Sequence, residues 1–256
     1  MKVGVRDAMT KNLSAESVRT RAVSMPFASP AYTVPPDRFL DRSSLTISYR
    51  SDLDPIASLV PEPLTVSDPV VSITFLYMRA PKLGNYYEVA QSISADLDGE
   101  PVSFRPAMFA GSVAAILQGR EVWGLPKKFA EPMLRVSYDT VVGTLKYSDS
   151  LVAQATMGYG YEQMGHEEAL KAAATPGAVL KIIPHVDGSP RVLELVRFDY
   201  GDVQVKEAYQ GPATLQLFEH ALAPLATLPV REIISAHHTV ADVTLLRGEV
   251  VHDYLV

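Results

Sequence analysis

The chain contains no cysteine, and this absence excludes several kinds of site before any motif is considered. Without thiols it cannot form a disulfide framework, a cysteine-ligated zinc site, an iron–sulfur cluster or a cysteine nucleophile. A composition without cysteine suits a reducing compartment, so we expect a cytoplasmic location. A chain of 256 residues can bury a large hydrophobic core without such cross-links.

Excess positive charge and long hydrophobic runs are also missing. The 23 lysines and arginines are outnumbered by 29 aspartates and glutamates, which gives a net charge of −6. Nucleic-acid binding needs a concentrated basic surface, so we expect no nucleic-acid partner. No apolar run approaches the roughly 18 residues of a membrane-spanning helix. The first 25 residues are charged throughout, unlike a secretory signal. We therefore expect no membrane partner.

The chain has no obvious internal division. Residues 1–25 are polar and predict an N-terminal arm, and a proline-spaced stretch then marks the start of the globular part. No glycine- or serine-rich linker, charge block or fixed repeat follows. The sequence therefore predicts one domain over residues 26–256.

Alternation of apolar and polar residues is the main pattern. In residues 44–50, Leu45, Ile47 and Tyr49 fall on one face of a strand. Similar patterns predict strands at 70–79, 86–95, 134–138, 141–147, 151–157, 179–183, 192–198 and 240–246. Helical patterns are fewer, at 54–59, 111–119 and 162–174. Strands joined by short turns predict a mainly β (α+β), largely antiparallel fold. Barrel-like closure of the sheet would leave no edge strand free to pair with another chain.

Two familiar kinds of site find little support. Gly158-Tyr159-Gly160 follows a strand, but Gln163 occupies the third glycine position of a dinucleotide-binding loop. Among six histidines, His237 and His238 are adjacent and would face opposite sides of a strand. We therefore expect no metal site and interpret the histidines as surface or core residues.

The pair Lys127-Lys128 is the strongest candidate for chemistry. It follows Pro126 and lies between apolar residues, although a lysine pair in general is most often a solvated face. Burial in an apolar pocket favours the neutral amine, which can attack a carbonyl carbon, and a second ammonium nearby would add to this effect. The residues alone leave both interpretations open.

The segment GREVWGLPKK (119–128) resembles the active-site segment of the acetoacetate decarboxylase family. Further motifs resemble the family in the same order: MPFASPAY (25–32), DRSSLTISYRSD (41–52), LVPEPL (59–64), DTVVGTLKYSDSLVAQATMGY (139–159), LKIIPHVDGSPRVLEL (180–195), GPATLQLFEHALAPLATLPVREI (211–233) and ADVTLLRGEVVHDYL (241–255). The resemblance covers roughly residues 25–255, which is essentially the whole predicted domain.

The resemblance implies a single-domain, cone-like β-barrel that forms cytoplasmic homo-oligomers and uses no metal and no organic cofactor. It assigns Lys127 as the amine that forms a Schiff base with a ketone, and Lys128 as its electrostatic neighbour. It also places Arg42 on a substrate carboxylate, Glu88 in an acid–base or electrostatic role, and Met108 in the pocket wall.

Two positions depart from the family's usual residues, and a third residue is an additional candidate for substrate binding. Thr74 stands where the decarboxylase has a second glutamate, and Leu125 stands where an aromatic residue usually precedes Pro-Lys-Lys. Arg105, on the strand that leads to Met108, is a further candidate ligand for a carboxylate. The loss of a carboxylate from the pocket predicts slow decarboxylation, or a different Schiff-base reaction.

The resulting expectation is a carbon–carbon lyase that acts on a small keto acid. Decarboxylation of acetoacetate or a related β-keto acid is the first hypothesis. A pyruvate aldolase–dehydratase that uses the same lysine is the second, because both reactions need an enamine. A non-catalytic ligand-binding protein is the third, and the presence of Lys127, Lys128, Arg42 and Glu88 argues against it.

Overall fold

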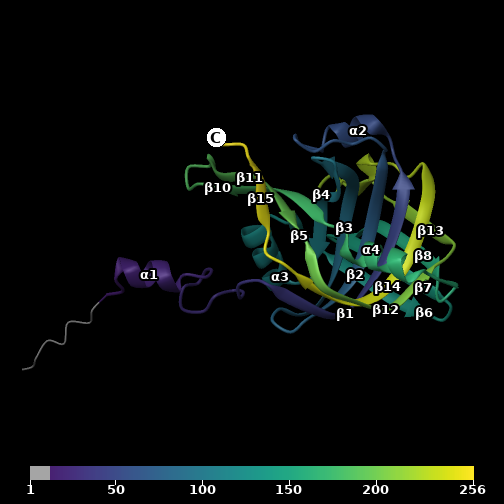
Figure 1. The fold of residues 1–256 in the computed structure, drawn as a ribbon, viewed down its shortest axis with the longest axis horizontal. Helices are drawn as coiled ribbons and strands as arrows, with labels where there is room; N and C mark the ends of the chain where they lie inside the picture. The colour runs from purple at the N-terminus through teal and green to yellow at the C-terminus, as the bar shows by residue number, and fades with distance from the viewer. Residues whose placement is uncertain (1–11) are drawn as a thin grey trace, which may run out of the picture.

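The fold is built from strands with a few short helices (Figure 1). A computed structural model describes residues 12–256. The strands are β1 (Asp37–Arg50), β2 (Val70–Ala80), β3 (Gly84–Leu97), β4 (Glu100–Ala110), β5 (Lys127–Phe129), β6 (Glu131–Ser137), β7 (Thr140–Tyr147), β8 (Ser150–Gly158), β9 (Glu162–Gln163), β10 (Gly177–Pro184), β11 (Pro190–Phe198), β12 (Tyr200–Gln210), β13 (Ala213–Leu217), β14 (Glu232–Leu245) and β15 (Glu249–Asp253). The helices are α1 (Ala15–Arg21), α2 (Leu53–Ala57), α3 (Val113–Gln118) and α4 (His166–Ala174), with a π-helical turn at Gly119–Trp123 and a 3₁₀ turn at Leu225–Thr227.

Two sheets form the body of the protein. The large sheet has the strand order β15-β11-β10-β4-β3-β2-β1-β14-β12-β9, and β5 pairs with β4 beside this path. Its central strands β1 to β4 form an antiparallel meander. The pairs β4–β10 and β4–β5 are parallel. The small sheet has the order β13-β8-β7-β6.

The main hydrophobic core lies between these two sheets. The odd-numbered residues in the middle of β1 and β2, such as Leu45, Ile47 and Phe75, are fully buried and pack in one cluster with residues of the small sheet, such as Val141 and Leu145. Because side chains alternate along a strand, the even-numbered residues of the same strands face the opposite side of the large sheet. That second face carries the cavity described below.

The second face is partly covered by other elements. Helix α4 packs against β12 and β14. A second cluster of buried apolar residues, which includes Phe39, Met108, Trp123 and Leu125, fills the space at one end of this face. The cavity is therefore enclosed by apolar residues at that end, and by the large sheet and α4 on its sides.

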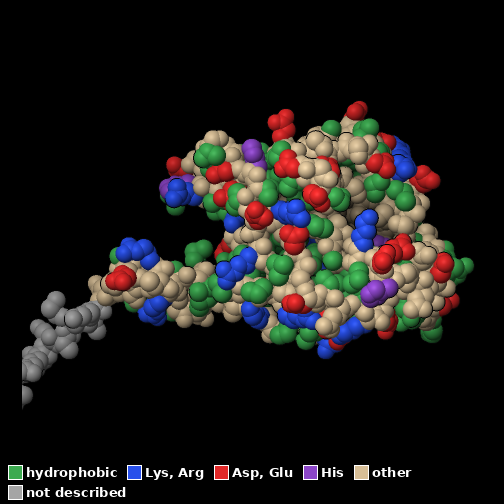
Figure 2. Space-filling model, in the orientation of Figure 1, with side chains coloured by type: hydrophobic (Ala, Val, Ile, Leu, Met, Phe, Trp, Pro, Cys, Tyr) green, Lys and Arg blue, Asp and Glu red, His purple; other side chains and the backbone are tan. Residues whose placement is uncertain are grey.

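The N-terminal segment stands apart from the body in Figure 1. Ser14 caps α1, accepting a hydrogen bond from the Ser17 amide, and no residue of this helix is buried. Leu13, Val18 and Met25 expose apolar side chains. The remainder of the predicted arm, residues 1–11, lies outside the described residues. Figure 2 shows acidic and basic side chains intermixed over the visible face of the body.

The mainly β, largely antiparallel character predicted from the sequence is confirmed. The closure that the word barrel implies is not present in residues 12–256: the large sheet ends at β15 and β9, and the small sheet at β13 and β6. The edge strands β9, β13 and β15 are short, which limits pairing with other chains without closure. No helix in this range is long and apolar enough to cross a membrane.

Most predicted strands match observed ones, but several elements differ. The helix predicted at 162–174 begins only at His166, after the two-residue strand β9. Strands β5, β9, β12, β13 and β15 were not predicted, and β4 was expected only as the strand that carries Arg105 and Met108. In β12, Val203 and Val205 alternate with exposed polar residues, but this stretch is short and has only two apolar residues.

Candidate active site

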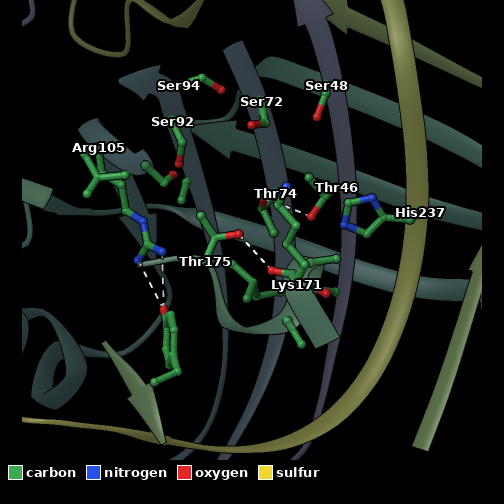
Figure 3. A pocket seen from close by; sticks show the side chains of 18 of the residues that line it. Thr46, Ser48, Ser72, Thr74, Ser92, Ser94, Arg105, Lys171, Thr175 and His237 are labelled. Atoms are coloured by element: carbon green, nitrogen blue, oxygen red, sulfur yellow. Dashed lines mark hydrogen bonds between the residues drawn. The ribbon is translucent and has the colours of Figure 1, made fainter. Parts of the chain in front are cut away.

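A cavity of about 400 Å³ opens on the second face of the large sheet. It is lined by residues of β1 to β4, by Tyr200 of β12 and His237 of β14, and by Lys171 and its neighbours in α4 (Figure 3). Its charged lining residues are Arg42, Glu88, Arg105 and Lys171.

Lys127 is buried beside Glu88. Strand β5 pairs with β4 so that Lys127 lies opposite Met108. The Lys127 Nζ atom is 2.6 Å from the Glu88 Oε2 atom, and both side chains are only 6% exposed. Within the described chain, Glu88 Oε2 has no hydrogen-bond partner, so the contact is a close ion pair. Lys127 Nζ also lies 5.7 Å from the centre of the Tyr86 ring.

The chain preceding Lys127 explains how a lysine comes to be held there. Ser112 caps α3, and the helix widens into a π-helical turn that begins at Gly119. Gly124 ends this turn at φ 86°, a conformation that favours glycine. A Cβ atom on Gly119 would lie 3.0 Å from Cδ and Cε of Lys127, so the absence of a side chain lets the lysine pack against this turn.

The buried Arg42 and the half-buried Arg105 lie around the Tyr200 side chain. The guanidinium carbon of Arg42 lies 5.0 Å from the centre of the Tyr200 ring. Nη1 and Nη2 of Arg105 both donate to the Tyr200 hydroxyl, at 3.3 Å. Arg42 Nη2 donates to the Ala173 carbonyl in α4 at 2.8 Å. In the described chain, Nε of Arg42 and Nε of Arg105 are buried without a hydrogen-bond partner. Donors left unpaired in this way favour an anionic ligand.

Burial and charge shift the pKa values around this site. Burial, and secondarily the nearby Arg105, lowers the pKa of Arg42. Burial acts to raise the pKa of Tyr200, but Arg105 and Arg42 together outweigh it, and the net shift is downward. Burial and the charge of Glu88 raise the pKa of Tyr86 well above its ordinary value. The two arginines therefore create a positive environment near Glu88 and Lys127.

Lys128 lies on the other face of the strand. It pairs opposite Phe109, which belongs to the core between the sheets, whereas Lys127 pairs opposite Met108 in the second cluster. Lys128 Nζ donates to the Leu222 carbonyl at 2.5 Å and lies 5.2 Å from the centre of the Tyr147 ring, and the residue is exposed. The structure thus does not bring the two ammonium groups together, and a role for Lys128 stays a prediction.

From this arrangement we expect Lys128→Gln to leave the pH dependence of the reaction nearly unchanged. An exposed charge that points away from the amine is screened by water and contributes little to its ionisation. The pH–rate profile of Lys128→Gln, compared with that of Lys128→Arg, measures this directly. A shift of more than one pH unit in Lys128→Gln alone would show that repulsion between the two lysines controls the amine.

The remaining predicted residues occupy different parts of the site. Arg42, Glu88, Arg105 and Thr74 line the cavity. Thr74 Oγ1 lies 3.1 Å from Thr46 Oγ1 on the neighbouring strand. Two other predicted residues, Met108 and Leu125, lie in the second cluster behind the lysine rather than in the cavity lining.

Four residues of the site were not predicted from the sequence: Tyr86, Tyr200, Lys171 and His237. His237 lines the cavity, whereas it was interpreted as a surface or core histidine. Its neighbour His238 instead lies 2.9 Å from the Ser43 hydroxyl, so the expectation that the two face opposite sides is confirmed. Tyr200 opens a strand that was not predicted, and only its contacts with two distant arginines identify it.

Known proteins resemble this chain over nearly its full length. The family model described as acetoacetate decarboxylase matches residues 24–255. The chain belongs to the acetoacetate decarboxylase family. Acetoacetate decarboxylase 1 of Bradyrhizobium diazoefficiens is 48% identical over 244 residues, which cover 95% of this chain and 98% of that protein. The acetoacetate decarboxylase of Burkholderia cenocepacia is 47% identical, over 95% of this chain and 99% of its own.

Solved structures agree with this family assignment. A structure of acetoacetate decarboxylase aligns with a TM-score of 0.92 and 42% identity, over 95% of this chain and 100% of its own. The acetoacetate decarboxylase of Legionella pneumophila aligns with a TM-score of 0.88 and 38% identity, over the same shares of the two chains. The enduracididine biosynthesis enzyme MppR, solved with pyruvate, is 20% identical with a TM-score of 0.77, over 90% of this chain and 96% of its own, and shares the fold.

For this member of the acetoacetate decarboxylase family, we expect Tyr200→Phe to raise KM by about tenfold. The substitution removes the hydroxyl that orients Arg105 but keeps the ring beside Arg42. Steady-state kinetics on a keto acid measure the effect. Tyr209→Phe, on the same strand, is the matched control. An equal loss in both variants would show that only the packing of β12 had changed.

Proposed function

We propose that the chain is a carbon–carbon lyase that decarboxylates acetoacetate or a related small β-keto acid through an imine on Lys127. The observation that carries this proposal is the buried Lys127–Glu88 pair beside a cavity with two arginines. Relatives at 47–48% identity that are named acetoacetate decarboxylase support it. An amine held against a carboxylate can transfer its proton at a contact of 2.6 Å and become a nucleophile.

The proposed reaction has four steps. The Lys127 amine attacks the ketone carbon, and loss of water gives an iminium ion. The bond to the carboxylate then breaks, CO₂ leaves, and the electron pair moves into the iminium to form an enamine. Protonation of the enamine carbon and hydrolysis by water release the ketone and the free amine. Covalent catalysis through an iminium supplies the electron sink from the protein's own side chain.

Each residue near Lys127 has a proposed role in the decarboxylation. Arg42 binds the carboxylate of the substrate, and Arg105 adds positive charge to the same region. Glu88 accepts the proton of Lys127 and is placed to return a proton later in the cycle. Thr74 contributes a hydroxyl in place of a carboxylate, so we expect decarboxylation to be slow compared with family members that carry both carboxylates.

Two incubations test this function and its alternative. Release of CO₂ from acetoacetate, with borohydride trapping of the intermediate on Lys127, would support decarboxylation. Condensation of pyruvate with an aldehyde, without release of CO₂ from acetoacetate, would instead establish the aldolase–dehydratase. Binding of either acid without trapping or turnover would leave a ligand-binding protein.

We further propose that the chain forms a homo-oligomer in the cytoplasm. The exposed apolar residues of the arm, Leu13, Val18 and Met25, support association with another copy of the chain. The absence of cysteine is compatible with a reducing compartment. Light scattering of the purified chain, with and without residues 1–24, tests the assembly.

A further inference from the structure

The cavity extends well beyond Glu88, the residue beside Lys127. Its far part, which we call the distal chamber, is formed by the side chains of Ser48, Ser72, Ser92, Ser94, Lys171 and His237. Thr46 and Thr74 lie between this chamber and Glu88. Figure 3 shows the four serines along one end of the cavity and Lys171 between Arg105 and His237. All the sheet residues of the chamber belong to the second face.

Strand register explains why these hydroxyls lie together. Ser48 pairs with Ser72, and Ser72 pairs with Ser92, so three serines form a row across β1, β2 and β3. Glu88 and Ser92 lie on the same face of β3, four residues apart, which corresponds to about 13 Å along the strand. A four-carbon keto acid bound at Lys127 cannot fill both ends. A volume of about 400 Å³ is instead typical of sites for larger ligands.

The chemistry of the chamber favours an anion. Its walls offer hydroxyl donors and the Lys171 ammonium, and Glu88, at the opposite end, is the only acidic residue lining the cavity within residues 12–256. Burial lowers the pKa of His237 to about 4, so this side chain is neutral at pH 7 and acts through hydrogen bonds. With Arg42 and Arg105 at the near end, the cavity has positive charge at two separated places.

We propose that the site takes an elongated 3-oxo dicarboxylic acid, with its reacting carboxylate at Arg42 and its second carboxylate in the distal chamber on Lys171. This inference rests on the proposed decarboxylation. The ketone carbon is attacked by Lys127, the carboxylate at C1 leaves as CO₂, and its electron pair forms the enamine, as described above. The second carboxylate takes no part in bond breaking, and the product is an 8-oxo monocarboxylic acid when the substrate has ten carbons.

Three substrates test the proposal on the wild-type protein: acetoacetate, 3-oxodecanoate and 3-oxodecanedioate. The last two have ten carbons, a length that spans about 13 Å from Glu88 to the serine row, and they differ in their terminal group, methyl against carboxylate. We expect kcat/KM for 3-oxodecanedioate to exceed that for 3-oxodecanoate by about tenfold, as one charge-assisted contact allows. Raising the salt concentration should reduce this ratio, because the Lys171 side chain is exposed.

Two variants locate the effect. Lys171→Gln should lower kcat/KM for 3-oxodecanedioate about fivefold to tenfold and leave acetoacetate within about twofold. Lys146→Gln, an exposed lysine on the small sheet, is the matched control and should change neither value. Ser72→Leu fills the row of serines, so it should reduce activity on both ten-carbon acids and spare acetoacetate.

The outcomes separate the two proposals. Turnover of acetoacetate without a preference for 3-oxodecanedioate over 3-oxodecanoate would overturn the dicarboxylate inference and leave the decarboxylase intact. An unchanged preference in Lys171→Gln would overturn the assignment of the second carboxylate to the chamber. Failure of both turnover and borohydride trapping with all three acids would overturn the proposed function and this inference with it.

Discussion

Replacement of Lys127 by alanine is expected to abolish both turnover and borohydride trapping, with a loss of rate of at least about 10⁴-fold. Within residues 12–256, Lys127 is the lysine that contacts Glu88. Other lysines, such as Lys128 and Lys146, are exposed and cannot replace it. Mass spectrometry of peptides after reduction in the presence of acetoacetate would identify the modified residue. An adduct on another lysine, or full activity in the variant, would contradict the mechanism.

The control for this experiment must address stability, since the alanine variant leaves the Glu88 carboxylate buried without its partner. Removing one member of a buried ion pair costs about 3–5 kcal/mol of unfolding free energy. Lys127→Arg retains the positive charge beside Glu88 but cannot form an imine with a ketone. We therefore expect Lys127→Arg to unfold nearer the wild-type denaturant midpoint than Lys127→Ala, while both variants are inactive. Activity in Lys127→Arg would exclude the covalent route.

The second large effect is expected for Arg42→Ala. A charge-assisted pair between a guanidinium and a carboxylate contributes about 1.5–3 kcal/mol, so KM for the keto acid should rise by roughly 10- to 150-fold. Trapping on Lys127 should persist at saturating substrate, because the amine and Glu88 are unchanged. Steady-state kinetics and trapping on the same preparation measure the two quantities.

Arg42→Lys is the informative comparison for this effect. It keeps a positive charge in the cavity but loses the planar fork that binds both carboxylate oxygens and stacks on Tyr200. We expect an intermediate KM, between those of wild type and Arg42→Ala. An unchanged kcat/KM in Arg42→Ala would remove this arginine from the substrate-binding site.

Central strands of the large sheet such as β1 could be predicted because apolar and polar residues alternate along them. Residues 44–50 alternate strictly, so the pattern identified both the strand and its core side. The outer strands were harder to predict. Strand β12 alternates only over residues 202–206, with two apolar residues, and β9 has only two residues, too few for any period to appear.

Some residues of the site could be identified from the sequence and others could not. Lys127 could be identified because Pro126 and apolar neighbours surround it in the sequence, and the family motif points to the same residue. Tyr200 could not be identified in this way, since its partners Arg42 and Arg105 are far away in the chain and meet it only in the folded protein. Lys128 is adjacent to Lys127 in the sequence, but side chains alternate along a strand and the two point apart, so a role for Lys128 stays a prediction.

Odd- and even-numbered residues of the central strands face opposite sides of the sheet, and this arrangement affects how the protein can change during evolution. On β1, β2 and β3, odd-numbered positions such as Ile47 and Ile73 hold the sheets together, whereas even-numbered positions such as Ser48 and Ser72 face the cavity. Substitutions at the even positions can therefore alter which acids are accepted while the core that drives folding stays intact. A combinatorial library restricted to positions 46, 48, 72, 74 and 92 should yield mostly folded variants with divergent substrate preferences. A library at 45, 47, 71, 73 and 75 should yield mostly unfolded chains.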